Sequence, residues 1–477
     1  MSLVRSIPRQ LQPWRFSSAA LRSYSTKELD ERKGDRERLV IIGSGWAGYG
    51  ILHLANKKKY QIVVISPRSY FAFTPLLAST AVGTLEFRNA IEPVRQKGVE
   101  LYQAWAEAVN FDAKYVTAQS NLQAGLDKDQ GGDKFRVYYD KVSTISLSNN
   151  HLLTRLKLVI APGAYSQTFG IPGVAQHANF LKDVSDARRI RQRVLSNFEK
   201  AALPTTTPEE RDKLLHFAIV GGGATGVEFA AELHDLLHDD LPALYPDGQG
   251  KDLVHNHAKI TIYDVAPRIL GMFDTALSEF AERHLKREGV TIKPQHFVSR
   301  VEDGVLHFKN DDPVPFGMLV WATGLSTNPF VGSIKGVQKE DTPAARILTD
   351  GKLRVLKEDG QVMEDVFALG DCARIKDAPI LPTTAQVASQ KAKYLSKQLN
   401  ADPSGGGDFR FRNFGALAYL GGWRAILQGE KQNVKGWAAW VIWRGAYLTK
   451  SVSWRNKILI PTLWMINWVF GRDISRF

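Results

Sequence analysis

The chain has 477 residues and a formal net charge of +13, from 62 Lys and Arg against 49 Asp and Glu. This length exceeds what a single hydrophobic core usually serves, so we expect two or three domains. The positive charge gathers at the two ends of the chain, in residues 1–26 and 434–477, and the part between them is nearly balanced. That distribution excludes a nucleic-acid-binding surface over the whole protein.

The first residues, 1–24, predict a mitochondrial presequence. Residues 1–26 are rich in Arg and Ser, contain no acid, and lack the continuous apolar run of a secretory signal. Arg22-Ser-Tyr-Ser25 resembles the processing pattern of matrix presequences, which would leave Ser25 at the mature end. The alternative is a basic tail without a targeting role.

The first strong structural signal is an apolar run, Leu39–Ile42, that leads directly into three glycines. It predicts a strand, a tight turn and the start of a helix. Gly43 permits the turn, Gly45 lets a pyrophosphate approach the backbone, and Gly48 lets the helix pack closely on the strand. The free N–H groups at the start of this helix favour a phosphate.

Between this turn and a second one like it, the sequence predicts two more buried strands. Tyr60–Ile65 ends at Ser66, where such folds usually place an acid for a ribose. Leu156–Ile160 is followed by a turn at Gly163.

Two stretches between these strands lack clean periodicity. Residues 70–95 contain aromatics and proline, and predict a loop-rich segment. Residues 119–134 are polar and rich in Gly and Asp, which predicts the tip of a hairpin.

The glycine pattern occurs a second time, at Phe217–Val220 followed by Gly221, Gly223 and Gly226. A single copy is weak evidence, because glycine turns after apolar runs are common. Two copies, each before a segment of helical periodicity, predict two dinucleotide sites in one chain.

After the second glycine turn, the strand Ile260–Tyr263 ends in Asp264. A carboxylate there can accept both ribose hydroxyls of NAD and would repel a 2′-phosphate, so it favours NADH, although Arg268 could favour the phosphate. The gap before Asp264 is longer than the usual length of roughly 20 residues, which predicts an insertion at about 235–257. Four histidines lie in or beside it, and we expect solvated loop residues and no metal site: His234, His238, His255 and His257.

The next signals indicate a return to the first domain. Leu319–Gly324 is a strand that ends in a small-residue turn, and Val366–Leu369 leads into Gly370 and Asp371. At the end of a strand, this carboxylate could hydrogen-bond the ribityl chain of a flavin. The helix that follows near Thr384 carries two glutamines four residues apart, which are neighbours on one face and would otherwise be read as surface amides: Gln386 and Gln390.

Residues 434–477 contain six of the eleven tryptophans of the chain, with interleaved Lys and Arg. Their apolar runs are shorter than the roughly 20 residues that span a bilayer. Tryptophan beside positive charge is typical of a helix that lies in the plane of a membrane surface. The alternatives are a dimer interface and an ordinary core helix.

In this order, the two glycine motifs, the turns at Gly324 and Asp371 and the glutamine pair resemble the two-dinucleotide-binding flavoprotein superfamily. Within it, the chain resembles the type II (alternative, rotenone-insensitive) NADH:ubiquinone oxidoreductases of fungal or plant mitochondria. The narrower resemblance covers roughly residues 36–477 and rests on four stretches: Ser66–Leu77, Gly221–Glu228, Ala385–Gln390 and Phe414–Gly421.

This resemblance implies an α/β fold with two Rossmann-like dinucleotide-binding domains and a C-terminal amphipathic region that anchors the protein to a membrane. The FAD-binding domain would be discontinuous, at 36–165 and 330–400. The NADH-binding domain would be 166–329, and the membrane-anchor and dimerisation region would be 401–477.

The implied activity is that of a respiratory oxidoreductase that does not pump protons. A hydride would pass from NADH to non-covalently bound FAD, and two electrons would then pass to ubiquinone at the inner mitochondrial membrane. The protein would be a peripheral homodimer that touches lipid through residues 434–477 and binds neither nucleic acid nor metal. The sequence has no acidic calcium loop after the NADH unit and no apolar span after the presequence, which favours the matrix side.

The resemblance also implies roles for single residues. Glu228 would lie near the flavin and the nicotinamide, paired with Lys182, although acids are favoured in a first helical turn in any case. Gln386 and Gln390 would line the quinone site. The FAD site would comprise Gly43, Ser44, Gly45, Ala47, Gly48, Ser66, Pro67, Arg68, Thr74, Gly163, Gly370, Asp371, Ala385 and Gln386. The NADH site would comprise Gly221, Gly222, Gly223, Thr225, Gly226, Glu228, Asp264, Thr323 and Gly324.

Other members of the superfamily are alternatives. Disulfide reductases and sulfide:quinone oxidoreductases need cysteine pairs, and the single Cys372 excludes them. A soluble NADH-dependent reductase of the monodehydroascorbate or ferredoxin type stays open, but leaves the tail unexplained. A mitochondrial flavoprotein resembling apoptosis-inducing factor, which would sense NADH without turnover, stays open as well.

Overall fold

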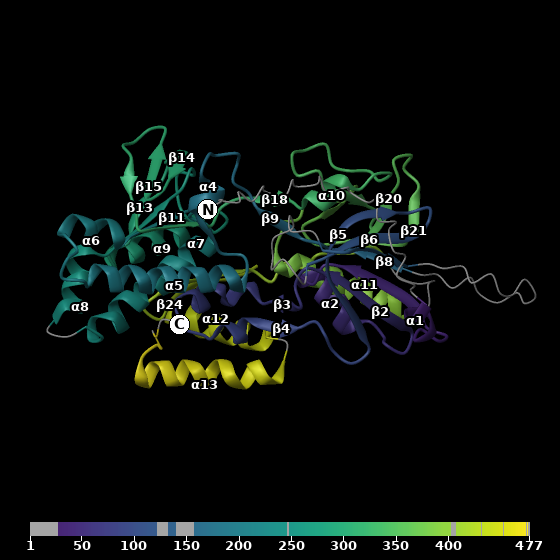
Figure 1. The fold of residues 1–477 in the computed structure, drawn as a ribbon, viewed down its shortest axis with the longest axis horizontal. Helices are drawn as coiled ribbons and strands as arrows, with labels where there is room; N and C mark the ends of the chain where they lie inside the picture. The colour runs from purple at the N-terminus through teal and green to yellow at the C-terminus, as the bar shows by residue number, and fades with distance from the viewer. Residues whose placement is uncertain are drawn as a thin grey trace, which may run out of the picture.

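The computed structural model describes residues 27–121, 132–139, 157–245, 248–401, 407–430, 432–451, 453–473 and 475. Within them the chain forms two open sheets that lie side by side, with two C-terminal helices along one face of the molecule (Figure 1). The predicted α/β fold with two Rossmann-type sheets is confirmed. The presequence predicted at 1–24 and most of the hairpin tip predicted at 119–134 lie outside the described residues.

The larger sheet has a parallel centre whose strands are buried on both faces, as the continuous apolar runs in the sequence predict. β1 (Glu37–Ile42) lies between β8 (Lys157–Ile160) and β2 (Tyr60–Ser66) and is parallel to both. In strand order the sheet comprises β22 (Ala373–Ile375), β19 (Ile347–Thr349), β20 (Arg354–Leu356), β21 (Val362–Ala368), β8, β1, β2, β5 (Val99–Asn110), β6 (Tyr115–Ser120) and β7 (Lys134–Tyr138).

The smaller sheet is entirely parallel in the described part of the chain. Its strands in order are β10 (Asn179–Phe180), β17 (Met318–Trp321), β11 (His216–Val220), β12 (Lys259–Tyr263) and β13 (Thr291–Lys293). A three-stranded antiparallel sheet packs beside it: β14 (Val298–Glu302), β15 (Val305–Phe308) and β16 (Val314–Pro315).

The chain passes between the two sheets at a short antiparallel pair, β9 (Ala164–Ser166) with β18 (Leu325–Thr327). The larger sheet is therefore discontinuous in sequence, because the smaller sheet is inserted between β8 and β19. Helices cover the sheets at α1 (Lys27–Glu31), α2 (Trp46–Leu54), α4 (Val174–His177), α5 (Val184–Ala201), α6 (Pro208–Leu214), α7 (Ala224–Asp235), α9 (Thr275–Arg287), α10 (Pro329–Ser333) and α11 (Ala385–Asn400).

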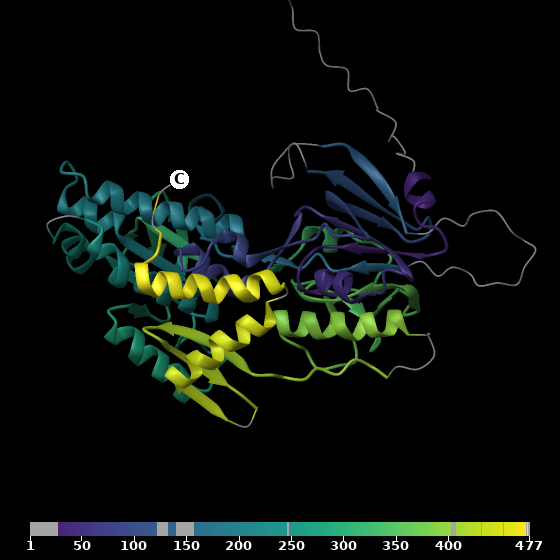
Figure 2. The same cartoon turned by 90° about the horizontal axis from the view of Figure 1, so that it is seen from below.

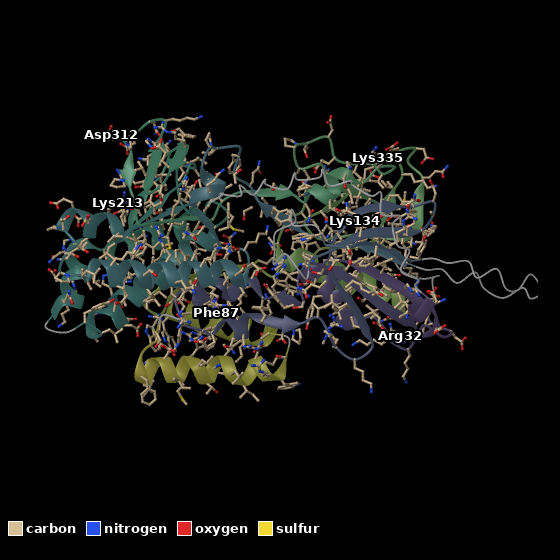
Figure 3. All side chains as sticks on the ribbon, viewed as in Figure 1. Arg32, Phe87, Lys134, Lys213, Asp312 and Lys335 are labelled. Atoms are coloured by element: carbon tan, nitrogen blue, oxygen red, sulfur yellow. The ribbon has the colours of Figure 1, made fainter. Side chains whose placement is uncertain are left out.

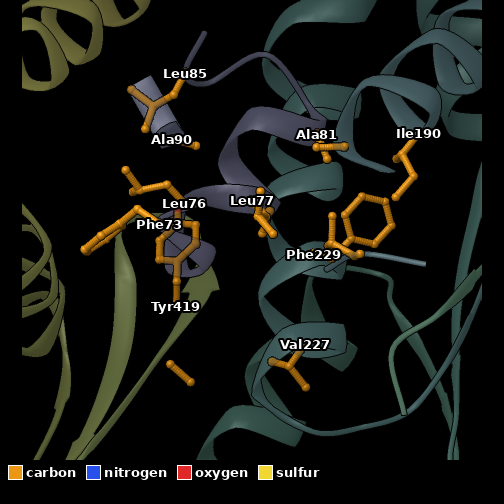
Figure 4. Packing of buried hydrophobic residues seen from close by; sticks show 14 of the residues in the cluster. Phe73, Leu76, Leu77, Ala81, Leu85, Ala90, Ile190, Val227, Phe229 and Tyr419 are labelled. Atoms are coloured by element: carbon orange, nitrogen blue, oxygen red, sulfur yellow. The ribbon is translucent and has the colours of Figure 1, made fainter. Parts of the chain in front are cut away.

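The stretch predicted as loop-rich, 70–95, is made of short elements that join the two halves. It contains β3 (Tyr70–Ala72), η1 (Thr74–Leu76), α3 (Leu77–Ala81), η2 (Phe87–Ala90) and β4 (Ile91–Pro93). Its apolar side chains, among them Phe73, Leu76 and Leu77, pack in one cluster with Phe229 of α7 and with Tyr419 (Figure 4). This cluster fixes the larger sheet, α7 and the C-terminal region relative to one another.

The insertion predicted at about 235–257 is helical, which corrects the expectation of loop histidines. It continues α7 as η3 (Leu236–Asp240), η4 (Leu241–Ala243), α8 (Gln249–Asp252) and η6 (Leu253–His257). His234 and His238 stack with ring centroids 4.0 Å apart, because they lie four residues apart on one helical face. Within the described residues, no group of three or more His, Cys, Asp or Glu side chains is arranged to hold a metal ion.

The C-terminal region is a small sheet followed by two helices. The strands β23 (Ala416–Gly421), β24 (Arg424–Gln428) and β25 (Asn433–Gly436) are antiparallel, and α12 (Trp437–Lys450) and α13 (Trp454–Phe470) follow. In Figure 2, α13 lies beside α12 along the half that contains the smaller sheet and ends near the junction with the other half. No helix of the described chain is long and apolar enough to cross a membrane.

The tail is partly core and partly surface. Ala439, Trp443 and Ile460 are buried in the main hydrophobic cluster, so an ordinary core role explains one face of these helices. The outer face carries large exposed apolar side chains and projects away from the rest of the molecule (Figure 3). The core alternative is therefore confirmed for one face of these helices, and contact of the other face with a membrane stays a prediction.

Candidate active site

The first glycine turn, between β1 and α2, has a geometry that only glycine permits at two positions. Gly43 has φ of +100°, and a Cβ there would lie 2.3 Å from the carbonyl oxygen of Ala161. A Cβ on Gly48 would lie 2.0 Å from the carbonyl oxygen of Gly43. Space at Gly45 is open, and no side chain caps the N-terminus of α2, so its first N–H groups stay available to a phosphate.

The second turn, between β11 and α7, repeats this geometry closely. Gly221 has φ of +119°, and a Cβ on Gly226 would lie 1.9 Å from the carbonyl oxygen of Gly221. Gly223 faces open space, and Thr225 is exposed in the first turn of α7. Two equivalent turns, each following a parallel strand, provide two places for a pyrophosphate.

Asp264 lies beside the second turn, at the end of β12. Its Oδ2 accepts a hydrogen bond from the Gly222 N–H at 2.5 Å, and its Oδ1 accepts one from the Ala266 N–H at 2.7 Å. The carboxylate is thereby fixed against the glycine turn, at the end of the strand where a ribose is expected.

Ser66 stands at the corresponding place beside the first turn. Its hydroxyl lies 2.8 Å from that of Ser44, and the backbone N–H of Arg68 donates to it. The Arg68 side chain forms an ion pair with Asp183, which also accepts a hydrogen bond from Tyr70. This pair connects the end of β2 to the start of α5 in the other half of the protein.

Gly370 and Asp371 lie next to the first turn and not the second. A Cβ on Gly370 would lie 3.4 Å from the Cβ of Ala47 in α2. Burial raises the pKa of Asp371, and the positive charges of Lys182 and Lys391 oppose that shift. Burial lowers the pKa of each of these two lysines to about 8. Asp371 thus lies within electrostatic reach of two lysines, the buried Lys391 and the partly buried Lys182.

Lys182 does not pair with Glu228, which corrects the pairing expected from the sequence. The Lys182 ammonium has no hydrogen-bond partner within the described structure, and the charge that acts on it most strongly is that of Asp371. Lys182 follows β10 at the start of the segment that leads into α5, so it extends from the smaller sheet toward the larger one.

Glu228 is buried in α7 and faces the C-terminal region. Its Oε1 accepts hydrogen bonds from the Tyr419 backbone N–H at 3.2 Å and from the Trp443 indole N–H at 3.3 Å. Burial raises the pKa of Glu228 to about 8, while these two donors act in the opposite direction. Near neutral pH this carboxyl can therefore both hold and release a proton.

The two glutamines of α11 lie on one face, as expected, and their side chains hold a backbone segment. Gln386 donates to the Gly415 carbonyl at 3.2 Å and accepts from the Phe414 N–H at 2.9 Å. Gln390 bonds both backbone groups of Arg412 in the same way, at 2.7 and 3.0 Å. They fix residues 412–415 along α11, just before β23.

The remaining predicted residues lie around the first turn and the crossover between the sheets. Thr74 accepts a hydrogen bond from the Trp46 indole at 3.1 Å, and the Pro67 carbonyl accepts one from Asn121. Gly163 and Gly324 have φ of +75° and +73°, at the two points where the chain enters β9 and β18. Of the other predicted site residues, Ala385 is the first residue of α11, and Thr323 lies against Gly221 in the second turn.

Residues 37–392 match the pyridine nucleotide-disulphide oxidoreductase family, and residues 414–473 match the NDH2 C-terminal domain. A probable NADH dehydrogenase of Dictyostelium discoideum is 39% identical, over 93% of this chain and 92% of that protein. A mitochondrial internal alternative NAD(P)H-ubiquinone oxidoreductase A1 of Solanum tuberosum is 36% identical, over 95% of this chain and 92% of its own length. The chain belongs to the alternative NAD(P)H-ubiquinone oxidoreductase family.

Solved structures agree with this membership. NDH2 from Plasmodium falciparum in complex with NADH superposes with a TM-score of 0.80 at 25% identity, over 92% of this chain and all of that one. Sulfide:quinone oxidoreductase of Aquifex aeolicus, at 17% identity and a TM-score of 0.63, shares the fold alone. As a member of the alternative oxidoreductase family with mitochondrial relatives, this is a mitochondrial flavoprotein.

In this member of the family, sequence reasoning missed Lys391. It is 3% exposed and lines a cavity with Asp371, Arg346 and Thr384. A signal was present, because Thr384, Val387, Ala388 and Lys391 follow the i, i+3, i+4, i+7 pattern of one helical face. The two glutamines lie on the opposite side of α11, which does not line this cavity.

Proposed function

We propose that this chain binds FAD at the first glycine turn and NADH at the second, and oxidises NADH with ubiquinone without pumping protons. The observation that carries the assignment is the difference between two otherwise equivalent turns. Gly370-Asp371 lies against the first turn, where a flavin ribityl chain would need a carboxylate. Asp264 is fixed against the second turn, where the ribose of NADH would need one. When bound, FAD supplies the chemistry by accepting a hydride and giving two electrons to a quinone.

The residues around the first turn fit a flavin dinucleotide. The open space at Gly45 and the uncapped start of α2 suit its pyrophosphate. Asp371 would bond the ribityl hydroxyls, and the positive charges of Lys182, Arg346 and Lys391 favour the charged form of this partly buried carboxyl group. Glu228 would hold a proton at the junction of α7, β23 and α12.

Steady-state NADH oxidation with a short-chain ubiquinone tests this function. We expect turnover, release of FAD from the denatured protein, and a preference for NADH over NADPH. A long-lived complex between NADH and the flavin without turnover would instead support an NADH sensor.

Asp264→Ala is expected to weaken NADH binding by roughly 1–3 kcal/mol, because a charge-assisted hydrogen bond to the ribose is lost. The FAD content of the purified protein should not change, since Asp264 lies beside the second turn alone. Titration of flavin reduction against NADH concentration measures the effect. If the unmodified protein works better with NADPH than with NADH, the assignment of Asp264 is wrong.

Gln386→Leu is expected to slow reoxidation of the flavin by ubiquinone and to leave its reduction by NADH fast. The reason is that Gln386 holds Phe414 and Gly415 at the entrance to the C-terminal region, away from the second turn. Stopped-flow measurement separates the two half-reactions. Gln249→Leu is the matched control, since Gln249 also bonds a backbone carbonyl, that of Ala202, but in the helical insertion. Equal slowing of both half-reactions with FAD retained would move Gln386 out of the quinone site.

We further propose that the outer face of α12 and α13 lies in one leaflet of the inner mitochondrial membrane. The support is a set of large apolar side chains at 42–82% exposure: Trp437, Val441, Ile442, Trp454, Ile458, Met465, Ile466, Trp468, Val469 and Phe470. Cations accompany them, with Lys457 5.1 Å from the Trp454 ring. Indoles and cations together suit the headgroup region of a bilayer.

The matrix side and a homodimer are proposals as well. Among the relatives, an internal plant form is 36% identical and an external form of Arabidopsis thaliana is 33% identical, which supports the internal side. Protease protection in intact mitochondria and in mitoplasts tests the side. Sedimentation of the detergent-solubilised protein tests the homodimer. We also propose the domain boundaries 36–165 with 330–400 for FAD, 166–329 for NADH and 401–477 for the C-terminal region.

A further inference from the structure

Three acids of α7 form a buried row on one face of this helix. Glu228, Glu232 and Asp235 follow one another at i, i+4 and i+7, and are 9%, 4% and 7% exposed. Carboxylates are seldom buried unless hydrogen-bonded donors or cations satisfy them. Glu232 is satisfied by the hydroxyls of Ser79 and Thr84, at 2.6 and 2.7 Å.

Asp235, at the C-terminal end of this row, holds the turn between β23 and β24. Its Oδ2 accepts a hydrogen bond from the Tyr419 hydroxyl at 2.6 Å, and its Oδ1 accepts one from the Gly422 N–H at 3.1 Å. Asp235 thus holds the hydroxyl of Tyr419, and Glu228 holds its backbone N–H, so both ends of this residue are fixed relative to α7.

Tyr419 in turn orients Trp443 of α12. The two rings stack with centroids 5.1 Å apart and an interplanar angle of 28°. The Trp443 indole N–H is the second donor to Glu228. A closed loop of contacts thus runs from Asp235 through Tyr419 and Trp443 back to α7, two turns of helix away.

We propose that Asp235 and Tyr419 are positioning residues that hold the two N–H donors on Glu228 and so set the protonation of this carboxyl during turnover. Neither residue needs to touch a substrate, since each acts through the orientation of Trp443 and of the Tyr419 backbone. The proposal rests on the proposed place of Glu228 beside the reacting groups.

The electrostatic surroundings give the direction of the effect. Glu228 faces Glu232 on its own helix, Tyr419 on β23, and Trp443 and Tyr447 on α12. Arg444 of α12 lies near Glu232 and Tyr419. Hydrogen bonds to the charged form lower the pKa of a carboxyl, so loss of either donor must raise it further. Looser positioning of Trp443 should therefore make Glu228 hold its proton more tightly.

The test is the pH profile of flavin reoxidation by ubiquinone, measured with the full-length holoenzyme after reduction by NADH. Trp443→Phe keeps a stacking ring but lacks the N–H, and Tyr419→Phe keeps the ring but releases Asp235. Each is expected to raise the proton affinity of the titrating group by about tenfold, since one hydrogen bond to a charged group is lost or weakened. Asp235→Asn can accept from the Gly422 N–H with its oxygen and donate its amide N–H to the Tyr419 hydroxyl oxygen, so it should keep most of the normal profile, whereas Asp235→Ala should not.

Tyr394→Phe is the matched control, because it removes a tyrosine hydroxyl that bonds the Gly407 carbonyl on the far side of α11. It should leave the profile unchanged. Glu228→Gln tests the place of Glu228 separately from the positioning role of Asp235 and Tyr419. If the titration persists in Glu228→Gln, the placement of Glu228 itself is wrong. If it disappears there but Trp443→Phe and Tyr419→Phe keep the normal profile, the positioning role is refuted while the proposed function stands.

Discussion

Gly48→Ala is expected to release FAD, whereas Gly226→Ala is expected to keep FAD and lose NADH. In both substitutions the added Cβ would clash with the equivalent backbone carbonyl oxygen of its glycine turn. A Cβ would lie 2.0 Å from the Gly43 carbonyl oxygen in one case and 1.9 Å from the Gly221 carbonyl oxygen in the other. Strain of about 1–3 kcal/mol from such overpacking corresponds to about a five- to 150-fold loss of affinity at the affected turn.

The pair is measured by the FAD-to-protein ratio after gel filtration and by titration of flavin reduction with NADH. Gly445→Ala, a third glycine inside a helix, is the control, because its Cβ would meet no atom within 4 Å. It should behave like the unmodified protein. Loss of FAD from Gly226→Ala with FAD retained in Gly48→Ala would reverse the assignment of the two turns.

Replacing three exposed aromatics of α13 is expected to abolish membrane binding without disturbing the fold. Trp454, Trp468 and Phe470 are 79%, 71% and 82% exposed. Changing them together to Gln should weaken binding to cardiolipin-containing liposomes by at least about 3 kcal/mol, or more than about a hundredfold. Reduction of FAD by NADH should persist, while activity with long-chain ubiquinone should fall.

These substitutions are a better test than a truncation of the whole tail, because Trp443 and Ile460 are buried in the main core and a truncation would remove them. Truncation near Val434 would also remove a donor to Glu228. Arg472 bonds Asp240 and Asn467 bonds Thr84, so they keep α13 docked in the triple variant. A control triple variant, Leu54→Gln, Leu203→Gln and Leu244→Gln, removes three apolar side chains that are 46–51% exposed on other surfaces. Equal sedimentation of both variants with liposomes would exclude α13 as the anchor.

Much of the site was predictable, because its chemistry depends on backbone geometry that leaves local marks in the sequence. The glycines at 43 and 48 are required by a turn, and Asp264 and Asp371 stand where buried strands end. Such signals span a few residues, so one stretch of sequence contains both the strand and the functional group that follows it.

The partners of buried charges could not be predicted, because they come from distant parts of the chain. Glu228 meets Tyr419 and Trp443, and Lys182 faces Asp371 instead of Glu228. The glutamines of α11 were correctly placed on one face, but only the structure shows that they bond residues 412–415. The helical form of the insertion was missed because its π-helical turns, η3 and η6, disturb the usual periodicity.

The central claim is that electrons pass from NADH through bound FAD to ubiquinone. Anaerobic double-mixing stopped flow tests it most directly: NADH is mixed with the holoenzyme, and a ubiquinone analogue is added once the flavin absorbance has bleached. We expect complete bleaching by one equivalent of NADH, followed by return of the oxidised flavin spectrum at a rate that accounts for steady-state turnover. A flavin that bleaches with NADH but stays reduced when ubiquinone is added would contradict the account.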